Sequence, residues 1–519
     1  MKRVGIIGAG PGGLAAAMLL AKAGVDVTVH ERRGSIGGRS STITAPTDQG
    51  TFRFDMGPTF FLYPRVLADI FSACGRNLDD EVELIRLDPQ YHLLFESGGE
   101  IRASGNMVRM AEEITRFSPA DAAALPRFMA DNRKKLAVFR PILEGAFNSV
   151  RDLARPDVLR GLSQLRPHRS VDTDLSSYFR DERVRLAFSF QSKYLGMSPF
   201  RCPSLFTILS FMEYEYGVYH PRGGTGAVMA AMARVARDLG AKIKLDDGVQ
   251  DIQFEGRRAT GVRTAAGVST YDALVVNADF AETMKRLVPD AIRRRWTDKR
   301  IATKKFSCST FMLYLGIEGT LPELSHHTVY LAGDYRRNLA EIEAGLAPAN
   351  PSFYVQNACV SDPALAPPGH STLYILVPVG HRVDEGVDWA TETPRYRALA
   401  LERLKRLGIP DIESRIRFEK VLTPQGWEDD LHIYRGATFN LAHNLAQMLH
   451  FRPRNRFEDL DGVYLVGGGT HPGSGLPVIF EGARISTRLL MEDLGVHADW
   501  DTPSATATPN YIPAIAEAL

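Results

Sequence analysis

The sequence has few cysteines and almost no net charge, and both facts exclude classes of function. Four cysteines occur in 519 residues, widely separated and without the short spacings of metal ligands. Buried thiols in a reducing compartment fit this pattern. The formal net charge of +1 provides no field to attract nucleic acid, and no nucleic-acid-binding motif is recognised. We therefore expect neither a metal site nor a nucleic-acid partner.

Long apolar runs are also scarce. Val4–Ala21 is uncharged and follows Lys2-Arg3, so it has the outline of a signal peptide or a membrane span. Five glycines and a proline interrupt the run, and the Glu31-Arg32-Arg33 that follows does not resemble a cleavage site. No other stretch is long and apolar enough to span a bilayer. Any contact with a membrane is therefore expected to be peripheral.

What the N-terminus does contain is a strand, a helix and a second strand in close succession. Lys2–Ile7 is short, apolar and β-branched, which predicts a strand buried on both faces. Leu14–Lys22 predicts a helix that ends near Gly24. Val25–Val29 predicts the second strand. This order is that of the unit that binds dinucleotides.

The glycines between the first strand and the helix fit a dinucleotide-binding turn. Gly8 allows the tight turn, Gly10 lets the backbone approach a pyrophosphate, and Gly13 lets the helix pack closely on the strand. The N-terminus of the helix offers N–H groups to the phosphates. Glu31, 18 residues after Gly13, is placed to accept hydrogen bonds from a ribose diol. We therefore predict a dinucleotide site here.

A second glycine-rich stretch, Gly462–Gly482, lies at the other end of the chain. Gly468 and Gly469 are expected to end a strand and to let the backbone pass close to a cofactor. The helix predicted to start at Leu476 would place Val478 in its first turn, with the positive end of the helix dipole at the cofactor. A fold that closes its dinucleotide site with its C-terminal segments is typical of FAD enzymes rather than nicotinamide enzymes.

Two motifs that follow the second predicted strand resemble those of the FAD-dependent amine oxidase and carotenoid desaturase superfamily. Residues 31–40 read ERRGSIGGRS, and residues 54–58 read FDMGP. The resemblance implies that Gly38 and Arg39 form a second phosphate-binding turn, in which the guanidinium offsets pyrophosphate charge. It also implies that Gly57 lies at the cofactor. For Arg39, a surface arginine in an ordinary turn is the alternative.

Two further segments narrow the resemblance to the bacterial-type phytoene desaturase family, including its dehydrosqualene (C30) desaturases. One is GVYHPRGGTG at 217–226, preceded by FSFQSKYLGMSP at 188–199, and the other is GVYLVGGGTHPGSGL at 462–476. The resemblance covers most of the chain and is weak at 107–169 and after residue 496. In the superfamily a strand, here 247–252, touches the adenine through its backbone, which implies a contact at Val249.

The resemblance implies an α/β fold, in which a Rossmann-type FAD-binding domain is combined with a discontinuous α+β substrate domain and a small helical segment that contacts the membrane. The FAD-binding domain is expected to comprise residues 1–75, 218–285 and 455–496. The substrate domain, an antiparallel sheet with helices, is expected to comprise residues 76–106, 170–217 and 286–454. The helical segment is expected at 107–169, and a loosely ordered tail at 497–519.

The part of this helical segment at 131–169 is basic and amphipathic. It holds nine Lys or Arg residues and four acidic residues, with apolar residues three or four positions apart. Such a pattern is typical of a helix on an anionic bilayer, although a surface helix packed on the body shows it too. We expect a cytoplasmic protein associated peripherally with the inner face of the cell membrane, with the basic run 285–305 either adding to the contact or forming a solvated face. Four prolines are expected to divide the segment into short helices, namely Pro126, Pro141, Pro156 and Pro167.

The resemblance implies FAD-dependent desaturation of a linear carotenoid precursor, a lipophilic polyisoprenoid of the phytoene or dehydrosqualene type. A hydride leaves an allylic carbon for the flavin and a proton leaves the neighbouring carbon, with oxygen or a membrane quinone as final electron acceptor. The cation is delocalised along the polyene, so a strong base is not required and no catalytic residue is singled out. His220, His471 and Glu213 are the titratable residues within or beside the motifs, and a structural role suits each equally well.

Other activities share this fold. The same family includes carotenoid isomerases, saturases and terminal-carbon oxygenases, which these motifs do not separate. A polar amine oxidase fits the C-terminal stretch less well. A prenyl-binding escort protein without redox chemistry would be expected to have decayed FAD motifs, whereas both phosphate-binding turns and the C-terminal loop are intact here.

Overall fold

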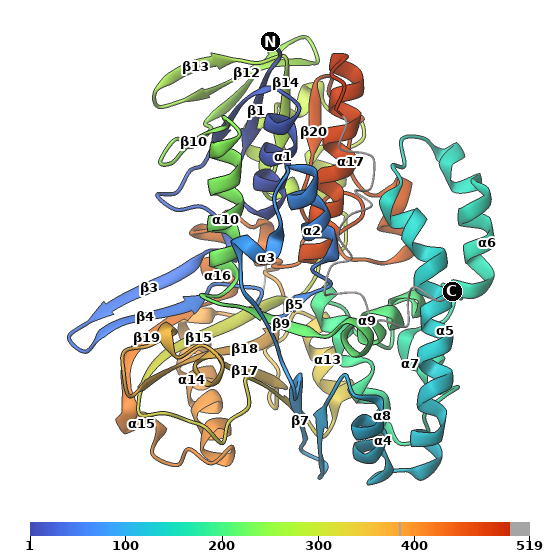
Figure 1. Cartoon of the computed structure of the whole chain (residues 1–519), viewed down its shortest axis with the longest axis vertical. Helices are drawn as coiled ribbons and strands as arrows, with labels where there is room; N and C mark the ends of the chain where they lie inside the picture. The colour runs from blue at the N-terminus through green and yellow to red at the C-terminus, as the bar shows by residue number, and fades with distance from the viewer. Residues whose placement is uncertain (384–385, 499–519) are drawn as a thin grey trace.

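The computed structural model describes residues 1–383 and 386–498. Figure 1 shows a parallel sheet with its helices in the upper part of the molecule and a mainly antiparallel sheet in the lower part. A group of helices that includes α5 and α6 stands along one side. This is the predicted combination of a Rossmann-type sheet with an α+β part and a helical segment. Most of the tail predicted at 497–519 lies outside the described residues.

The parallel sheet gathers strands from both ends of the chain. Its order is β10-β2-β1-β14-β20, and every neighbouring pair is parallel. Its strands are β1 (Arg3–Ile7), β2 (Asp26–His30), β10 (Lys242–Lys244), β14 (Ala273–Val276) and β20 (Val463–Leu465). The strands predicted at 2–7 and 25–29 are thus confirmed within one residue. The carboxyl ends of these parallel strands meet at one edge of the sheet, where ligands bind in folds of this class.

The uncharged run near the N-terminus forms β1 and the helix α1 (Pro11–Lys22). Every residue from Gly12 to Ala21 is buried, because α10 (Thr225–Asp238) and α17 (Leu476–Leu494) pack against α1. A helix that is covered on all sides has no polar face, which explains its likeness to a targeting segment. No helix within residues 1–383 or 386–498 combines the length and the hydrophobicity that crossing a bilayer needs.

The lower part of the molecule is built on a seven-stranded sheet of order β19-β15-β18-β17-β16-β7-β8, antiparallel except between β16 and β7. Its strands are β7 (Tyr91–Phe95), β8 (Glu100–Ala103), β15 (Ser309–Glu318), β16 (His327–Leu331), β17 (Phe353–Asn357), β18 (His370–Val379) and β19 (Ile416–Leu422). Alternate residues of β15 face opposite sides. Phe311 and Leu313 pack with residues of α14 (Trp389–Arg406), whereas Met312 and Tyr314 pack with the segment 43–56 on the other face, where Met312 also lines a cavity.

Smaller elements complete the fold. Three small sheets pair β3 (Thr42–Thr47) with β4 (Gly50–Asp55), β9 (Val218–Pro221) with β5 (Phe61–Leu62) and β6 (Leu84–Arg86), and β12 (Arg258–Thr264) with β11 (Asp251–Glu255) and β13 (Gly267–Thr270). The remaining helices outside the side group are α2 (Arg65–Ala73), α3 (Leu78–Glu81), α9 (Ile208–Tyr216), α11 (Phe280–Leu287), α12 (Asp298–Ala302), α13 (Tyr335–Glu343), α15 (Ile412–Arg415) and α16 (Pro424–Asp429). The strand predicted over 247–252 begins only at Asp251, so Val249 lies in the loop before β11. The four cysteines are free thiols, and three of them are buried.

The helical segment is less divided than the prolines predict. It contains α4 (Met107–Thr115), α5 (Pro119–Glu144), the short 3-10 helix η2 (Val150–Ala154) and α6 (Pro156–Leu165), followed by α7 (Val171–Leu175) and α8 (Glu182–Ala187). Pro126 and Pro141 lie inside α5 and do not end it, so the prediction was wrong at both. A buried stripe that includes Phe128 and Phe139 fixes α5 on the body and offsets the backbone hydrogen bonds lost at each proline. Pro156 begins α6, where proline is favoured, and Pro167 follows its end.

Candidate cofactor and substrate site

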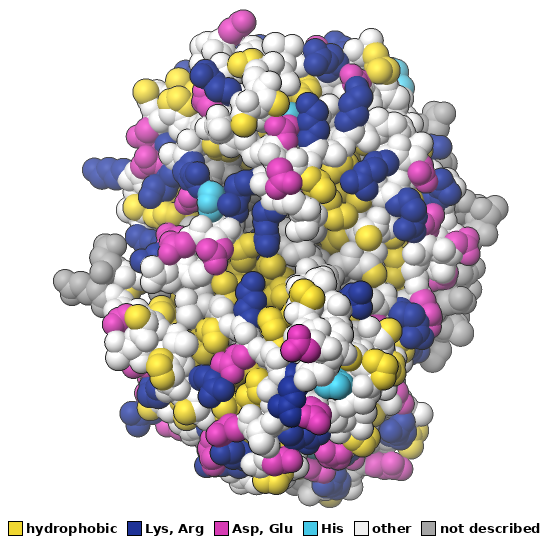
Figure 2. Space-filling view, turned by 90° about the vertical axis from the view of Figure 1, so that its left-hand side faces the viewer, with side chains coloured by type: hydrophobic (Ala, Val, Ile, Leu, Met, Phe, Trp, Pro, Cys, Tyr) yellow, Lys and Arg dark blue, Asp and Glu magenta, His cyan; other side chains and the backbone are white. Residues whose placement is uncertain are grey.

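A cavity of about 600 Å³ lies between the parallel sheet and the seven-stranded sheet. Its wall includes Ile7 of β1 and Asn277 after β14 on one side, and Met312, Tyr354 and Leu376 of the lower sheet on the other. The space-filling view in Figure 2 shows hydrophobic side chains inside a hollow between the upper and lower parts of the molecule. Cavities of this size bind cofactors and small molecules.

Most of the predicted cofactor residues meet at this cavity. Nine of the eleven line it, namely Gly8, Gly10, Glu31, Gly38, Arg39, Gly57, Val249, Gly468 and Val478. Gly13 and Gly469 lie behind the wall, because a Cβ on Gly13 would stand 2.2 Å from the Gly8 carbonyl oxygen and one on Gly469 would stand 2.6 Å from Phe280 Cβ. These two glycines therefore allow close packing. This role was predicted for Gly13, whereas Gly469 was predicted to lie at the cofactor.

Glu31 joins the end of β2 to the glycine turn. Its buried carboxylate accepts hydrogen bonds from the backbone N–H groups of Ala9 at 2.8 Å and of Arg33 at 2.9 Å. The same side chain borders the cavity, so its remaining lone pairs are available to a hydroxyl group there. This is the arrangement that a ribose diol requires.

Two helices begin at the cavity without a capping side chain. The residue that precedes α1 is Gly10, and the residue that precedes α17 is Gly475, so neither can satisfy the first N–H groups of its helix. The positive ends of both helix dipoles therefore reach the cavity wall. Phosphate groups and an anionic ring are the ligands that such helix ends favour.

Glycines on the wall leave space that a side chain would fill. The nearest atom to an added Cβ is Gly10 Cα at 3.6 Å for Gly38, Asn277 Oδ1 at 3.5 Å for Gly467, and Val478 Cγ2 at 3.7 Å for Gly475. A Cβ at these positions would therefore project into the cavity rather than into the protein. The backbone can thus approach a bound dinucleotide from both ends of the chain.

Asn277 is a site residue that the sequence did not point to. Its Nδ2 donates to the Gly8 carbonyl at 3.1 Å. Its atoms also stand next to the places where a Cβ would lie on Gly10, Gly12 and Gly13, at 2.8 to 3.0 Å. The feature that could have identified Asn277 is its position directly after the strand Ala273–Val276, at the carboxyl end of the parallel sheet.

The Arg39 guanidinium lies on the cavity wall but contacts protein groups. It donates a hydrogen bond to the carbonyl of Thr438. Asp279 is its nearest source of opposite charge, and burial raises the pKa of that carboxyl to about 6 while Arg39 opposes the rise. The side chain is therefore not an ordinary exposed arginine, which was the alternative weighed for it.

Arg452 holds the C-terminal loop from behind and belongs to no motif. Its side chain is fully buried, and burial lowers its pKa to about 9. Among the described residues it has no carboxylate partner. It donates instead to five backbone carbonyls, those of Gly468 at 2.6 Å, Leu441 at 3.0 Å, Thr470 at 3.1 Å, Gln447 at 3.3 Å and Ala442 at 3.4 Å.

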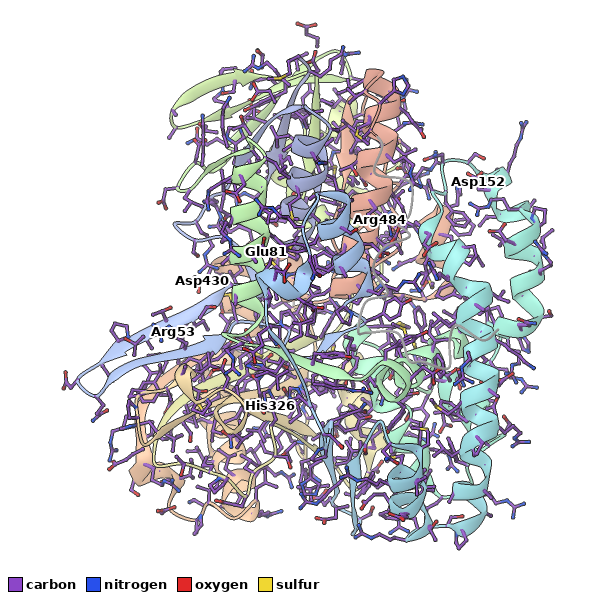
Figure 3. All side chains as sticks on the ribbon, viewed as in Figure 1. Arg53, Glu81, Asp152, His326, Asp430 and Arg484 are labelled. Atoms are coloured by element: carbon purple, nitrogen blue, oxygen red, sulfur yellow. The ribbon has the colours of Figure 1, made fainter. Side chains whose placement is uncertain are left out.

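Away from the glycine turns the cavity wall is mainly aromatic and aliphatic. Among its residues are Phe60, Leu136, Phe139, Phe190, Phe206, Ile208, Met212, Val329, Leu331 and Tyr354. At its rim on α5, Arg140 pairs with Glu144 at 2.6 Å. Arg484, on α17 (Figure 3), pairs with Glu481 of the same rim at 3.0 Å and stands 3.8 Å from Asp69. The arrangement suits a long apolar molecule.

Of the three titratable residues within or beside the motifs, none lines the cavity. The His471 Nε2–H donates to the Gly145 carbonyl at 3.0 Å, and burial lowers the pKa of His471 to about 3, so the ring is neutral and structural. His220 is buried 3.4 Å from Asp362. Glu213 is buried close to the substrate half of the cavity.

The chain is similar to known proteins over most of its length. The profile of the family described as flavin containing amine oxidoreductase matches residues 11–489. A 4,4'-diapophytoene desaturase (4,4'-diapolycopene-forming) from Methylomonas sp is 42% identical over 494 residues, which are 95% of this chain and 95% of that protein. A phytoene desaturase (lycopene-forming) from Pseudescherichia vulneris is 36% identical over 501 residues, which are 95% of this chain and 100% of that protein.

The fold has relatives of known structure. The crystal structure of an oxidoreductase from Methanosarcina mazei aligns with a TM-score of 0.61 and 19% identity, over 95% of this chain and 100% of that one. At this identity the likeness shows the fold alone. The family match and the carotenoid desaturase relatives extend over nearly the whole length, and the cavity wall suits FAD. The chain therefore belongs to the flavin-containing amine oxidoreductase family, among its FAD-dependent carotenoid desaturases.

Proposed function

We propose that this enzyme introduces double bonds into a linear C30 carotenoid precursor of the diapophytoene (dehydrosqualene) type. The C30 length of the substrate is supported by the 42% identity to a diapophytoene desaturase. Phytoene and zeta-carotene desaturases that match the chain are 34% to 37% identical. Phytoene, the C40 analogue, is the second candidate and would undergo the same chemistry.

The two halves of the cavity wall differ in chemistry, which supports binding of the cofactor by one half and of the substrate by the other. Gly8, Gly10 and the start of α1 would hold the pyrophosphate of FAD, Glu31 its ribose, and the start of α17 at Val478 the flavin ring. Bound FAD supplies the acceptor for a hydride. We assign these tasks to an FAD-binding domain of residues 1–75, 218–285 and 455–496, and the substrate to a domain of residues 76–106, 170–217 and 286–454.

The apolar half of the cavity would take up the hydrocarbon. Each CH₂ removed from water contributes about 0.8 kcal/mol, so a polyisoprenoid leaves a membrane only for an equally apolar passage. The aromatic and aliphatic wall provides one beside the Gly57 segment. It also keeps water from a cation that forms when a hydride departs.

Pigment formation in engineered cells tests this function. In cells that make dehydrosqualene, expression of this chain is expected to give coloured products with longer conjugation, measured by absorption spectra of extracted pigments. Cells that make phytoene are expected to give less product. The proposal fails if neither hydrocarbon gains conjugation: isomerised, hydrogenated or end-oxidised polyenes would then identify an isomerase, a saturase or a terminal oxygenase.

We also propose a peripheral contact with an anionic membrane through η2 and α6. Val150, Leu159 and Leu162 are exposed there by 61%, 54% and 52%, next to the exposed Arg151 and Arg160. Other parts of the basic pattern are structural. Lys135 is buried 2.6 Å from Asp174, and in the run 285–305 both Arg293 and Trp296 are buried.

The double substitution Leu159→Glu and Leu162→Glu is expected to lower binding to anionic vesicles at least about tenfold in a flotation assay. Each buried leucine contributes about 1.5–3 kcal/mol, and about 1.4 kcal/mol is a factor of ten. The control is Leu346→Glu, at a leucine that is exposed by 55% outside the segment. Equal losses in both variants would refute a specific contact through α6.

For reoxidation of the flavin we propose either oxygen or a quinone of that membrane. A peripheral site favours the quinone, because it and the hydrocarbon share the same phase. Turnover under argon with an added quinone distinguishes the two acceptors.

A further inference from the structure

Helix α9 places a carboxyl group, that of Glu213, inside the protein and beside the apolar half of the cavity. The residue is 0% exposed. Its Oε2 accepts hydrogen bonds from the Gln191 amide at 2.9 Å and from the Tyr91 hydroxyl at 3.0 Å. Its Oε1 has no hydrogen-bond partner among the described residues. A buried carboxyl oxygen without a partner costs stability, so such a group usually has a task.

Tyr194 lies on the cavity wall near Glu213. It belongs to the 3-10 helix η3 (Phe190–Leu195) and lines the cavity, and its hydroxyl also has no hydrogen-bond partner among the described residues. The rings of Tyr194 and Tyr91 both contact those of Phe60 and Phe190, and the Tyr91 hydroxyl donates to Glu213, so Tyr194 lies near this carboxyl. Burial, and next the charge of Glu213, raise the pKa of Tyr194 well above its ordinary value. The Tyr194 ring lies 5.3 Å from that of Phe60, in the segment that follows Gly57.

Desaturation releases a proton, which a group on or behind this wall can accept. For each double bond a hydride leaves one carbon and a proton leaves the next. Of the ionisable groups on the wall, Glu144 and Glu481 pair with arginines, and Lys193 is an amine whose pKa is lowered by burial. Asp279 accepts from Asn440 at 2.7 Å and caps α11. His443 accepts the Ser474 N–H at 3.0 Å. Glu213 Oε1 is free of such bonds.

We propose that the proton lost by the substrate passes to Glu213 through the Tyr194 hydroxyl. The C–H bond breaks and its electron pair forms the new double bond. The Tyr194 oxygen takes the proton while its own proton moves to Glu213 Oε1. The neighbouring carbon loses a hydride, for which FAD would supply the acceptor when bound, so atoms and electrons balance. This inference rests on the proposed desaturation.

The surroundings of the carboxyl support this role. Burial raises the pKa of Glu213 to about 7, against the opposing hydrogen bonds. The polar groups that face it are neutral, namely the Tyr91, Tyr194 and Tyr214 phenols and the Gln191 amide. No ion pair among the described residues includes it. Because an acceptor must be deprotonated, substrate oxidation is expected to speed up as pH rises through about 7.

The test is flavin reduction by the polyene in a single turnover under argon, followed by absorbance from pH 5.5 to 8.5. Glu213→Gln keeps shape and burial and is expected to lower the rate about a hundredfold, with no pH dependence near 7. Glu215→Gln is the matched control, because Glu215 lies on the same helix and pairs with Arg133 at 2.7 Å instead. It is expected to keep the wild-type profile. Infrared titration of the holoenzyme is expected to show a protonated carboxyl that disappears through about pH 7 in wild type and is missing in Glu213→Gln.

The outcomes separate the two proposals. A wild-type enzyme that no polyene reduces refutes the proposed desaturation. An active wild type with Glu213→Gln of unchanged rate or pH profile overturns the role of Glu213. If Glu213→Gln does not retain FAD, Tyr194→Phe decides: a rate at least about tenfold lower with full flavin content supports the relay, and a wild-type rate overturns it.

Discussion

Arg452→Met is expected to destabilise the protein by at least about 3 kcal/mol and to empty the FAD site. The substitution removes a donor from five buried carbonyls, of which that of Ala442 keeps a hydrogen bond from Gln447, and each buried polar group left unsatisfied costs about 1–3 kcal/mol before relaxation. One of these carbonyls belongs to Gly468, which lines the cavity, so the loop should lose its position as well. Urea denaturation and the flavin absorbance per protein measure the two effects.

The control is Arg294→Met, the same change at an exposed arginine. It is expected to change stability by less than about 0.5 kcal/mol. Arg452→Lys separates charge from geometry, because a lysine has three donors in place of the planar fork and should regain only part of the stability. A wild-type urea midpoint for Arg452→Met would contradict the assigned role.

Gly13→Ala is expected to abolish FAD binding and to destabilise the parallel sheet by about 1–3 kcal/mol or more. The added Cβ would stand 2.2 Å from the Gly8 carbonyl oxygen and 2.8 Å from Asn277 Nδ2. Neither atom is at the end of a free side chain, since the Gly8 carbonyl accepts from Asn277 and the Gly8 N–H donates to His30 at 2.9 Å. The helix must therefore move away from β1, and the pyrophosphate turn opens with it. Flavin content after purification is the measurement.

Gly34→Ala is its control, because the nearest atoms to an added Cβ there are the carboxylate oxygens of Asp246 at 3.3 Å. A side chain of this kind can turn aside, so flavin content should be unchanged. Full flavin occupancy in Gly13→Ala would show that the turn tolerates a wider spacing than its contacts indicate.

The parts of the site that could be predicted are those in which neighbours in sequence are also neighbours in space. Gly8, Gly10 and Glu31 lie within one strand-helix-strand unit, and the roles of their backbone and carboxylate follow from that unit alone. The motif at 462–476 allowed a second group of contacts to be placed by resemblance. Asn277 was missed although it directly follows the strand Ala273–Val276, because nothing local shows that its amide faces five glycines.

Other features depend on contacts that no local pattern reports. Arg452 looks like any arginine in a polar loop, and its burial results from carbonyls of two segments that close around it. Helix ends were predicted at Pro126 and Pro141 because a proline inside a helix removes a backbone hydrogen bond and lowers the stability of the helix. The packing of α5 on the body outweighs that cost, and Lys135 of its basic pattern is bound inside. Tertiary structure decided each of these cases.

The position of α1 has a consequence for how the chain is made. Helix α17 completes the burial of α1 and is the last of the described helices to be synthesised. Helix α1 therefore cannot be fully buried until most of the chain has left the ribosome. At about 5–20 residues per second, the nascent helix waits roughly half a minute or longer for that partner. During translation this apolar segment is therefore open to chaperones, and a chain that ends before residue 476 would leave that face of α1 uncovered.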